Sequence, residues 1–140
     1  MRITPTLNFN GRCREAIETY EKAFGGRIGC LITYRQADDP AYNPMLREDQ
    51  RDYVYHAELM LDGQRIMMSD HVDMEFQTCY TNFLTITYDT KEEVMAAYNA
   101  LSEGSLTIYP MEATHYSSCR VVFVDRFGIR WGIMTEQTER

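Results

Sequence analysis

The sequence lacks any apolar run that approaches the ~20 residues needed for a membrane-spanning helix. Basic residues are also scarce: the chain has 14 Lys and Arg but 21 Asp and Glu, which gives a formal net charge of −7. Nucleic-acid binding depends on clustered cations that displace counterions from phosphates. We therefore expect a protein with neither a membrane nor a nucleic acid as its partner.

The cysteines show no metal-binding spacing. Cys13, Cys30, Cys79 and Cys119 are far apart and form no C-x-x-C pair, which excludes a zinc ribbon. Residues 1–9 lack the apolar segment of a secretory signal. These features predict a cytoplasmic protein whose thiols are reduced and buried.

Familiar catalytic signatures are missing as well. The chain contains no G-x-S-x-G nucleophile motif and no glycine-rich phosphate loop. It also lacks a strand, glycine-rich turn and helix of the kind that binds nucleotide-like cofactors. The sequence therefore predicts no cofactor and assigns no catalytic residue.

A β-α-β-β-β pattern does occur, and it occurs twice. The first copy is expected to comprise a strand over 3–9, a helix over 12–24, a strand over 28–34 and hairpin strands over 53–61 and 65–69. The second is expected to comprise a strand over 82–88, a helix capped by Asp89 or Thr90, and strands over 106–111, 119–124 and 129–134. Tyr20 and Tyr98 lie 78 residues apart, as do Gly26 and Gly104, which supports a duplication.

Residues 35–52 interrupt the first copy. They hold two prolines and many charges, which is typical of a long surface loop or lid. We interpret them as an insertion that the second copy lacks.

Three segments resemble a known family: LNFNGRCREAIETYEKAFGG at 7–26, HAELMLDGQRIMMSD at 56–70 and DRFGIRWGIM at 125–134. They are similar to the vicinal oxygen chelate superfamily of glyoxalases, bleomycin-resistance proteins and dioxygenases, and most of all to its PhnB-like, or demethylubiquinone methyltransferase-like, branch. The resemblance implies one α+β domain over 1–140. It also implies two tandem βαβββ modules, about 1–70 and 82–135, that form a curved mixed β-sheet cleft and assemble as a homodimer.

In the metal-dependent members of that superfamily, each module supplies one ligand from its first strand and one from its last. The resemblance carries these positions to Pro5, Met68 (Met67 if the register shifts by one), Phe83 and Gly132. Hard and borderline divalent ions require imidazole or carboxylate ligands, and none of these residues supplies one. We therefore expect no metal.

A polar group offers a first candidate for chemistry. His56 and Glu58 lie two apart on a strand and so point to the same face, and Asp70 ends the partner strand. Such residues could act as a general base and its orienting group. The alternative is that Tyr55, Ala57 and the leucines form the core face while His56 and Glu58 face solvent.

An apolar group offers a second candidate. Met68, Phe83 and Trp131, with Thr85 as a polar neighbour, could line a ligand pocket. The alternative for each is ordinary core packing or a dimer interface.

Two weaker patterns are also present. Asp70, His71 and Asp73, with His115 or Cys119, could form a small metal cluster, although a solvated turn is the more ordinary explanation. The equivalent arginines Arg65 and Arg130 could bind an anion, although solvent-facing strand arginines are the simpler explanation.

The sequence thus favours small-molecule binding in a metal-free cleft. The candidate ligand-binding residues are His56, Glu58, Met68, Asp70, Phe83, Thr85 and Trp131. Three alternatives stay open: an enzyme that uses His56 and Glu58 for acid/base chemistry, a metal-dependent lyase or dioxygenase with a rearranged site, and a purely structural role.

Overall fold

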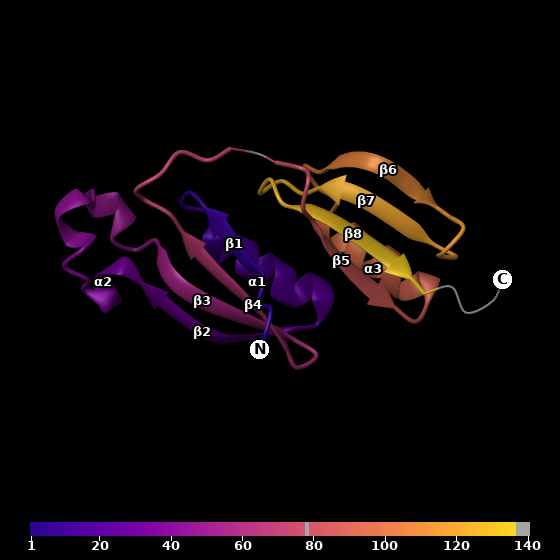
Figure 1. Cartoon of the computed structure of the whole chain (residues 1–140), viewed down its shortest axis with the longest axis horizontal. Helices are drawn as coiled ribbons and strands as arrows, with labels where there is room; N and C mark the ends of the chain where they lie inside the picture. Colours follow the sequence, from indigo (N-terminus) through magenta and orange to yellow (C-terminus); the bar gives the residue numbers. More distant parts are fainter. Residues whose placement is uncertain (78, 137–140) are drawn as a thin grey trace. The chain divides into compact units, whose positions relative to one another are not determined.

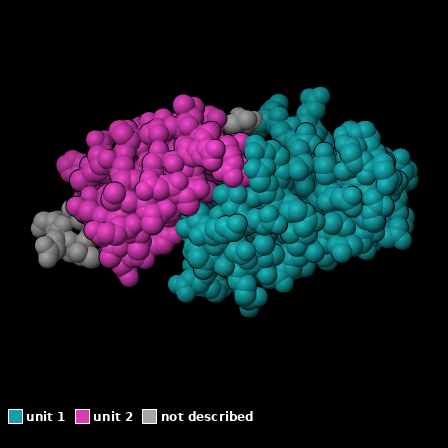
Figure 2. Space-filling model, turned by 180° about the vertical axis from the view of Figure 1, so that it is seen from behind, with its two compact units in different colours: residues 1–77 teal, residues 78–140 magenta. Residues whose placement is uncertain are grey.

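The computed structural model describes residues 1–77 and 79–136, and the chain divides into two compact units, residues 1–77 and 78–140 (Figures 1 and 2). Each unit contains one four-stranded mixed sheet and one long helix. The α+β class and the two βαβββ modules are therefore confirmed. The assignment of the whole chain to one domain stays a prediction.

The first unit follows the expected order closely. Its elements are β1 (Thr6–Phe9), α1 (Cys13–Phe24), β2 (Arg27–Thr33), β3 (Val54–Leu61) and β4 (Gln64–Asp70). The strands lie in the order β1-β4-β3-β2, with β1 parallel to β4 and the other pairs antiparallel. Asp62 and Gly63 turn the β3–β4 hairpin with φ of 50° and 77°, the positive values that a two-residue hairpin turn requires.

Helix α1 packs against the sheet through residues spaced three and four apart, namely Cys13, Ala16, Ile17 and Tyr20. No side chain of its own caps the start of α1. Instead the Asp70 carboxylate accepts hydrogen bonds from the amides of Gly11 and Cys13, at 2.7 and 3.1 Å. The end of β4 therefore fixes the beginning of α1.

The expected insertion is a folded segment between β2 and β3. It contains the short helix α2 (Tyr34–Ala37) and two 3₁₀ turns, η1 (Asn43–Met45) and η2 (Glu48–Gln50). Leu46 and Gln50 are buried, so the segment packs against the unit.

The second unit repeats the topology without that insertion. Its elements are β5 (Leu84–Tyr88), α3 (Lys91–Leu101), β6 (Leu106–Glu112), β7 (Arg120–Val124) and β8 (Arg130–Thr135). The strand order is β5-β8-β7-β6, with β5 parallel to β8. Of the two expected caps, Thr90 is the one whose hydroxyl accepts a hydrogen bond from the Glu93 amide.

Each sheet has one face covered by its own helix and one face turned away from it, which we call the helix-free face. In β4, Ile66, Met68 and Asp70 are buried on the helix side, so Met67 and Ser69 lie on the helix-free face. The same alternation holds in β8 of the second unit, where Trp131 and Ile133 are buried beneath α3.

The cysteines differ in exposure. Cys13 and Cys119 are buried free thiols and Cys30 is half-buried. The expectation of a buried thiol is wrong for Cys79, which is exposed because it lies in the connector between β4 and β5. Among the described residues, no helix is long and apolar enough to cross a membrane.

Candidate functional site

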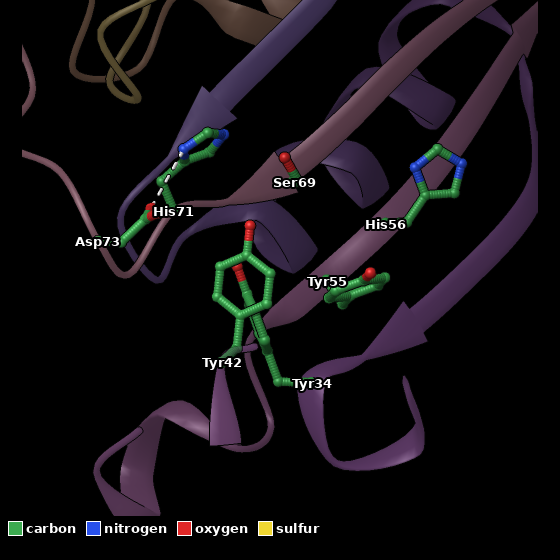
Figure 3. Close-up of a pocket in the computed structure, with 7 residues that line it drawn as sticks. All are labelled: Tyr34, Tyr42, Tyr55, His56, Ser69, His71 and Asp73. Carbon is green, nitrogen blue, oxygen red and sulfur yellow. Dashed lines mark ion pairs between the residues drawn. The ribbon is translucent and has the colours of Figure 1, made fainter. Parts of the chain in front are cut away.

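The first unit contains a cavity of about 290 Å³ on its helix-free side. It is lined by Tyr34, Tyr42, Tyr55, His56, Ser69, His71 and Asp73 (Figure 3). Strands β3 and β4 supply three of these residues, while Tyr34 and Tyr42 come from the insertion between β2 and β3. We call this cavity the tyrosine pocket.

A bulge in β3 shapes the pocket. Ile32 of β2 pairs with His56 and the next residue, Thr33, pairs with Val54, so Tyr55 is an extra residue in β3. In a regular strand, Tyr55 and His56 would point to opposite faces. The bulge brings both side chains to the pocket (Figure 3), whereas strict alternation would place Tyr55 with Ala57 in the core.

The three tyrosines form one aromatic cluster. The ring centroids of Tyr34 and Tyr55 are 5.3 Å apart, those of Tyr34 and Tyr42 5.6 Å, and those of Tyr42 and Tyr55 6.0 Å. All three pairs meet edge to face, the arrangement that aromatic quadrupoles favour. Tyr34 is buried, and the rings of Tyr42 and Tyr55 lie nearly perpendicular, at 82°, in the lining of the pocket.

The hydroxyl groups of the cluster have different partners. The Tyr34 hydroxyl donates to the Asp70 carbonyl at 2.6 Å, and the Tyr55 hydroxyl donates to Asp39 Oδ2 at 3.0 Å. The Tyr42 hydroxyl has no hydrogen-bond partner within residues 1–77 and 79–136. It is therefore the phenol of the cluster that is available to a ligand.

Burial and negative charge also affect these phenols. Burial raises the pKa of Tyr34 to about 12, with smaller contributions from Tyr42 and from the carboxylates of Asp73 and Asp70. The pKa of Tyr55 is raised chiefly by its hydrogen bond to Asp39 and by the charge of that carboxylate. Both phenols therefore stay neutral at physiological pH.

His56 belongs to a short polar chain. Its Nε2 lies 3.4 Å from Glu58 Oε1, and the same oxygen accepts a hydrogen bond from Arg65 Nη1 at 3.0 Å. A carboxylate oxygen can only accept, so in the neutral ring this contact places the imidazole hydrogen on Nε2 and leaves Nδ1 as the acceptor nitrogen. Glu58 thus orients His56, as a carboxylate orients the base in many acid/base sites.

A second histidine follows β4. The His71 amide donates to the Phe9 carbonyl at 2.8 Å, which holds the backbone in place. Its Nδ1 lies 3.8 Å from Asp73 Oδ1, which is beyond hydrogen-bond distance (Figure 3). Ser69 lies two residues before His71 on the same face, and its hydroxyl donates to Asn8 Oδ1 at 3.2 Å.

The candidates predicted in the first unit lie on two different faces. His56 lines the tyrosine pocket and Glu58 supports it from the same helix-free face. Met68 and Asp70 lie on the helix side, with exposures of 0% and 1%. The Asp70 carboxylate also accepts a hydrogen bond from the Val54 amide at 2.9 Å. It therefore lies between the first residues of α1 and the first residue of β3.

The candidates predicted in the second unit do not form one group either. Phe83 and Thr85 are exposed and lie beside Gly132. A Cβ atom added at Gly132 would lie 3.2 Å from Phe83 Cε2 and 3.1 Å from Thr85 Oγ1. Trp131 is fully buried on the opposite face, and its Nε1 donates to Asp125 Oδ2 at 2.9 Å. Trp131 therefore has a core role.

Sequence reasoning missed most of the pocket. It placed none of the three tyrosines in a site, and it considered His71 and Asp73 only as metal ligands. One usable signal was that Tyr34 and Tyr55 lie close to the two ends of residues 35–52, the range predicted for the insertion, which contains Tyr42. The bulge that re-aims Tyr55 has no comparable signal in the sequence.

The residues present do not fit a divalent metal. The register pairs Thr6 with Met67 in the first unit and Thr85 with Gly132 in the second, on the helix-free faces of the first and last strands. These four residues offer no imidazole or carboxylate. Among residues 1–77 and 79–136, no group of three or more His, Cys, Asp or Glu could hold an ion.

Comparison with known proteins identifies the family. The profile of the 3-demethylubiquinone-9 3-methyltransferase family matches residues 1–134. The chain belongs to this family. It is the branch that also carries the PhnB name, as expected from the three sequence segments.

Similar proteins cover almost the whole chain. Protein YjdN of Escherichia coli (strain K12) is 26% identical, with 95% of this chain and 94% of YjdN covered. The crystal structure of PA1353 from Pseudomonas aeruginosa is 30% identical with a TM-score of 0.84, and 98% of each chain is covered. A PhnB protein from Bacillus cereus is 23% identical with a TM-score of 0.79, covering 96% of this chain and 99% of that protein.

More distant structures share the glyoxalase fold. The fosfomycin resistance protein FosX from Listeria monocytogenes has a TM-score of 0.65 at 10% identity, covering 99% of this chain and 94% of FosX. A point mutant of FosX was crystallised with Mn(II) and 1S,2S-dihydroxypropylphosphonic acid. This likeness confirms the predicted fold class.

The methyl transfer in the family description implies a nucleotide-like cofactor, and the glycines do not fit one. Gly25 and Gly26 follow a helix and precede a strand, which is the reverse of a cofactor-binding turn. A Cβ at Gly26 would clash with the Leu61 side chain and lie 2.9 Å from the Met60 carbonyl oxygen, so this glycine is needed for packing against the hairpin.

Proposed function

We propose that the first unit binds a small organic molecule in the tyrosine pocket and that no metal takes part. The observation that supports this most directly is the cavity itself, whose lining combines the rings of Tyr42 and Tyr55 with the polar atoms of Ser69 and His71. Ligand sites combine apolar walls with a few polar groups in this way. A volume of about 290 Å³ suits a small metabolite.

The polar groups have distinct roles in this proposal. The Tyr42 hydroxyl and His56 Nδ1 bind polar atoms of the ligand. Ser69 forms the floor of the pocket and accepts a hydrogen bond through its oxygen lone pairs, because its own hydrogen is donated to Asn8. The insertion, which the second module lacks, positions Tyr42.

A ligand-observed NMR screen tests the proposal. Fragments of every charge type are mixed with protein purified without a metal-chelating column, in the presence of EDTA. Ser69→Leu fills the floor of the pocket and is expected to abolish saturation transfer to the hits. Thr6→Leu is the matched control, because Thr6 is an exposed hydroxyl residue outside the pocket on the first strand of the same sheet.

Two results would reject this function. The first is a screen without hits. The second is a set of hits that Ser69→Leu leaves unchanged. A parallel variant, Thr85→Leu, tests the second-unit residues predicted from the sequence, and it is expected to leave the hits unchanged.

Acid/base catalysis is a second candidate, and the chain from Arg65 through Glu58 to His56 favours it. A histidine oriented by a carboxylate beside a bound ligand can remove a proton from it. Once the screen supplies a ligand, it is incubated with the protein in D₂O and its C–H signals are followed by NMR. Exchange that is lost in His56→Asn, and slowed in Glu58→Gln, supports catalysis. If the wild-type protein causes no exchange of the ligand's C–H hydrogens, catalysis is rejected and only the binding proposal remains.

The assembly proposed for the protein is a homodimer, as the family resemblance implies. Its support in this chain is the exposure of Phe83, Leu106 and Tyr109, three large apolar side chains of the second unit. Sedimentation equilibrium is expected to give twice the mass of one chain, and a monomer at all concentrations would reject the proposal.

The cytoplasm is the proposed location. All four cysteines are free thiols, which suits a reducing compartment. Fractionation of cells that produce the tagged protein is the test, and recovery in a secreted or envelope fraction would contradict it.

A further inference from the structure

The proposed function leaves the ligand's charge open, and the groups around the tyrosine pocket bear on it. The pocket lining contains one carboxylate, Asp73, and no Lys or Arg. A second carboxylate, Asp39, lies behind Tyr55 and accepts its hydroxyl hydrogen. A negatively charged ligand would therefore meet negative charge and no permanent cation.

Nearby arginines are already paired. Arg65 binds Glu58 at 3.0 Å, and Arg35 binds Glu48 and Asp52 at 3.0 and 3.2 Å. Each has an acidic partner, so none offers an unopposed charge to the pocket. His56 likewise faces Glu58, which would offset a positive charge on its ring.

The aromatic walls favour the opposite charge. The Tyr42 and Tyr55 rings meet at 82°, which leaves a corner with two electron-rich surfaces. Cations bind against such faces, and more strongly when the site excludes water. Burial is the main cause of the raised pKa of the Tyr34 phenol, and the carboxylates of Asp73 and Asp70 add to it, so these acids oppose a further negative charge in the cluster.

We infer that the tyrosine pocket selects a small organic ammonium ion, with the cation against the Tyr42 and Tyr55 rings and Asp73 as its counter-charge. This inference rests on the proposed function, because it names the ligand class of the same pocket. It departs from FosX, whose co-crystallised ligand is a phosphonic acid.

Three probes of similar size test the inference by isothermal titration. Choline is the cation, 3,3-dimethylbutan-1-ol is its neutral isostere, and dihydroxypropylphosphonic acid is the anion. Choline is expected to bind at least about tenfold more tightly than the neutral isostere, which corresponds to about 1.4 kcal/mol. The phosphonic acid is expected not to bind.

Single substitutions test which residues produce the preference for a cation. Asp73→Asn is expected to weaken choline binding about tenfold and to leave the neutral isostere unchanged. Asp62→Asn is the matched control, since it makes the same change at an exposed turn of the same unit. Tyr42→Phe keeps the ring but loses the hydroxyl, and it is expected to weaken choline binding far less than Tyr42→Leu, which is expected to abolish it.

The outcomes separate the two proposals. If the neutral isostere or the phosphonic acid binds as tightly as choline in a Ser69-dependent manner, the ammonium inference fails and the pocket remains a binding site. The inference also fails if Asp73→Asn and Asp62→Asn weaken choline binding equally. If fragments of every charge fail to bind, the proposed function itself is rejected.

Discussion

The Tyr55 hydroxyl donates a 3.0 Å hydrogen bond to Asp39, and this contact ties strand β3 to the insertion that carries Tyr42. Asp39 also accepts the Ala41 amide at 2.9 Å, so its carboxylate holds the turn that precedes Tyr42. The position of one pocket wall thus depends on a side chain from the other.

Tyr55→Phe is expected to loosen this segment while leaving the ring in the pocket. The amides of residues 38–46 should exchange with deuterium several-fold faster, because local opening no longer has to break the Tyr55–Asp39 bond. Hydrogen exchange followed by mass spectrometry measures this. Tyr109→Phe, at an exposed tyrosine of the second unit, is the control. Equal exchange in Tyr55→Phe and the wild type would show that Asp39 does not restrain the insertion.

The two hairpin turns differ in a way that predicts unequal stability effects. Asp125 is 4% exposed and accepts hydrogen bonds from the Phe127 and Ile129 amides and from the Trp131 indole. Asp62, its counterpart in the first module, is exposed. Asp125→Asn is expected to lower the free energy of unfolding by about 2 kcal/mol, because an amide NH₂ would face a buried donor.

Asp62→Asn is the comparison for that experiment and is expected to change the free energy by less than about 0.5 kcal/mol. Asparagine tolerates the positive φ of 50° at this position. Urea unfolding followed by Trp131 fluorescence measures both variants. Similar losses in the two variants would mean that the buried Asp125–Trp131 contact adds little.

Most of the fold could be predicted from the sequence because its signals are local. The apolar spacing of Ala16, Ile17 and Tyr20 predicts α1, and the Asp62-Gly63 pair predicts the β3–β4 turn. The order of the elements, repeated with the helix tyrosines Tyr20 and Tyr98 78 residues apart, then predicts two equivalent sheets. Each of these inferences needs only neighbours in the chain.

The pocket could not be predicted in the same way because it depends on a break in the periodicity. A sequence shows that His56 and Glu58 share a face, but the bulge at Tyr55 becomes visible only when β2 and β3 are paired. The alternation of side chains along β4 also places Met68 on the helix side, since its neighbours Met67 and Ser69 lie on the helix-free face. A shift of one residue exchanges the two faces of a strand.

The four thiols are expected to differ in reactivity. A hydrogen bond from the Thr81 hydroxyl, with its Oγ1 3.0 Å from the Cys79 sulfur, lowers the pKa of this exposed thiol. Burial raises the pKa of Cys13, and Asp70 adds to the effect. Cys79 should react first with DTNB in the folded protein, and Cys13 only on unfolding. Cys79→Ser should remove the fast phase, and a fast phase that persists would assign it to another cysteine.

Metal removal is expected to have no effect. Elemental analysis of protein purified without a chelating column should find far less than one Ni, Zn, Mn or Fe ion per chain, because Thr6, Met67, Thr85 and Gly132 offer no suitable ligand. EDTA should leave the Tm unchanged. One ion per chain would instead require donors outside these strand positions, and His56→Ala and His71→Ala would be the first variants to test for its loss.

Alkaline pH should weaken the fold through Tyr34. Its pKa is raised from 10.0 to about 12, chiefly by burial, so the folded state favours the neutral phenol. The stabilisation is fully present below about pH 10 and is lost as the pH rises through the folded-state value of about 12. Tyr34→Phe removes the titrating group together with its hydrogen bond to the Asp70 carbonyl.

The Tyr34→Phe variant should be less stable than the wild type at about pH 8, by roughly 1–2 kcal/mol. The difference should shrink between pH 10 and 12, as followed by urea unfolding across that range. Two profiles that stay parallel up to pH 12 would show that this phenol does not couple its ionisation to folding.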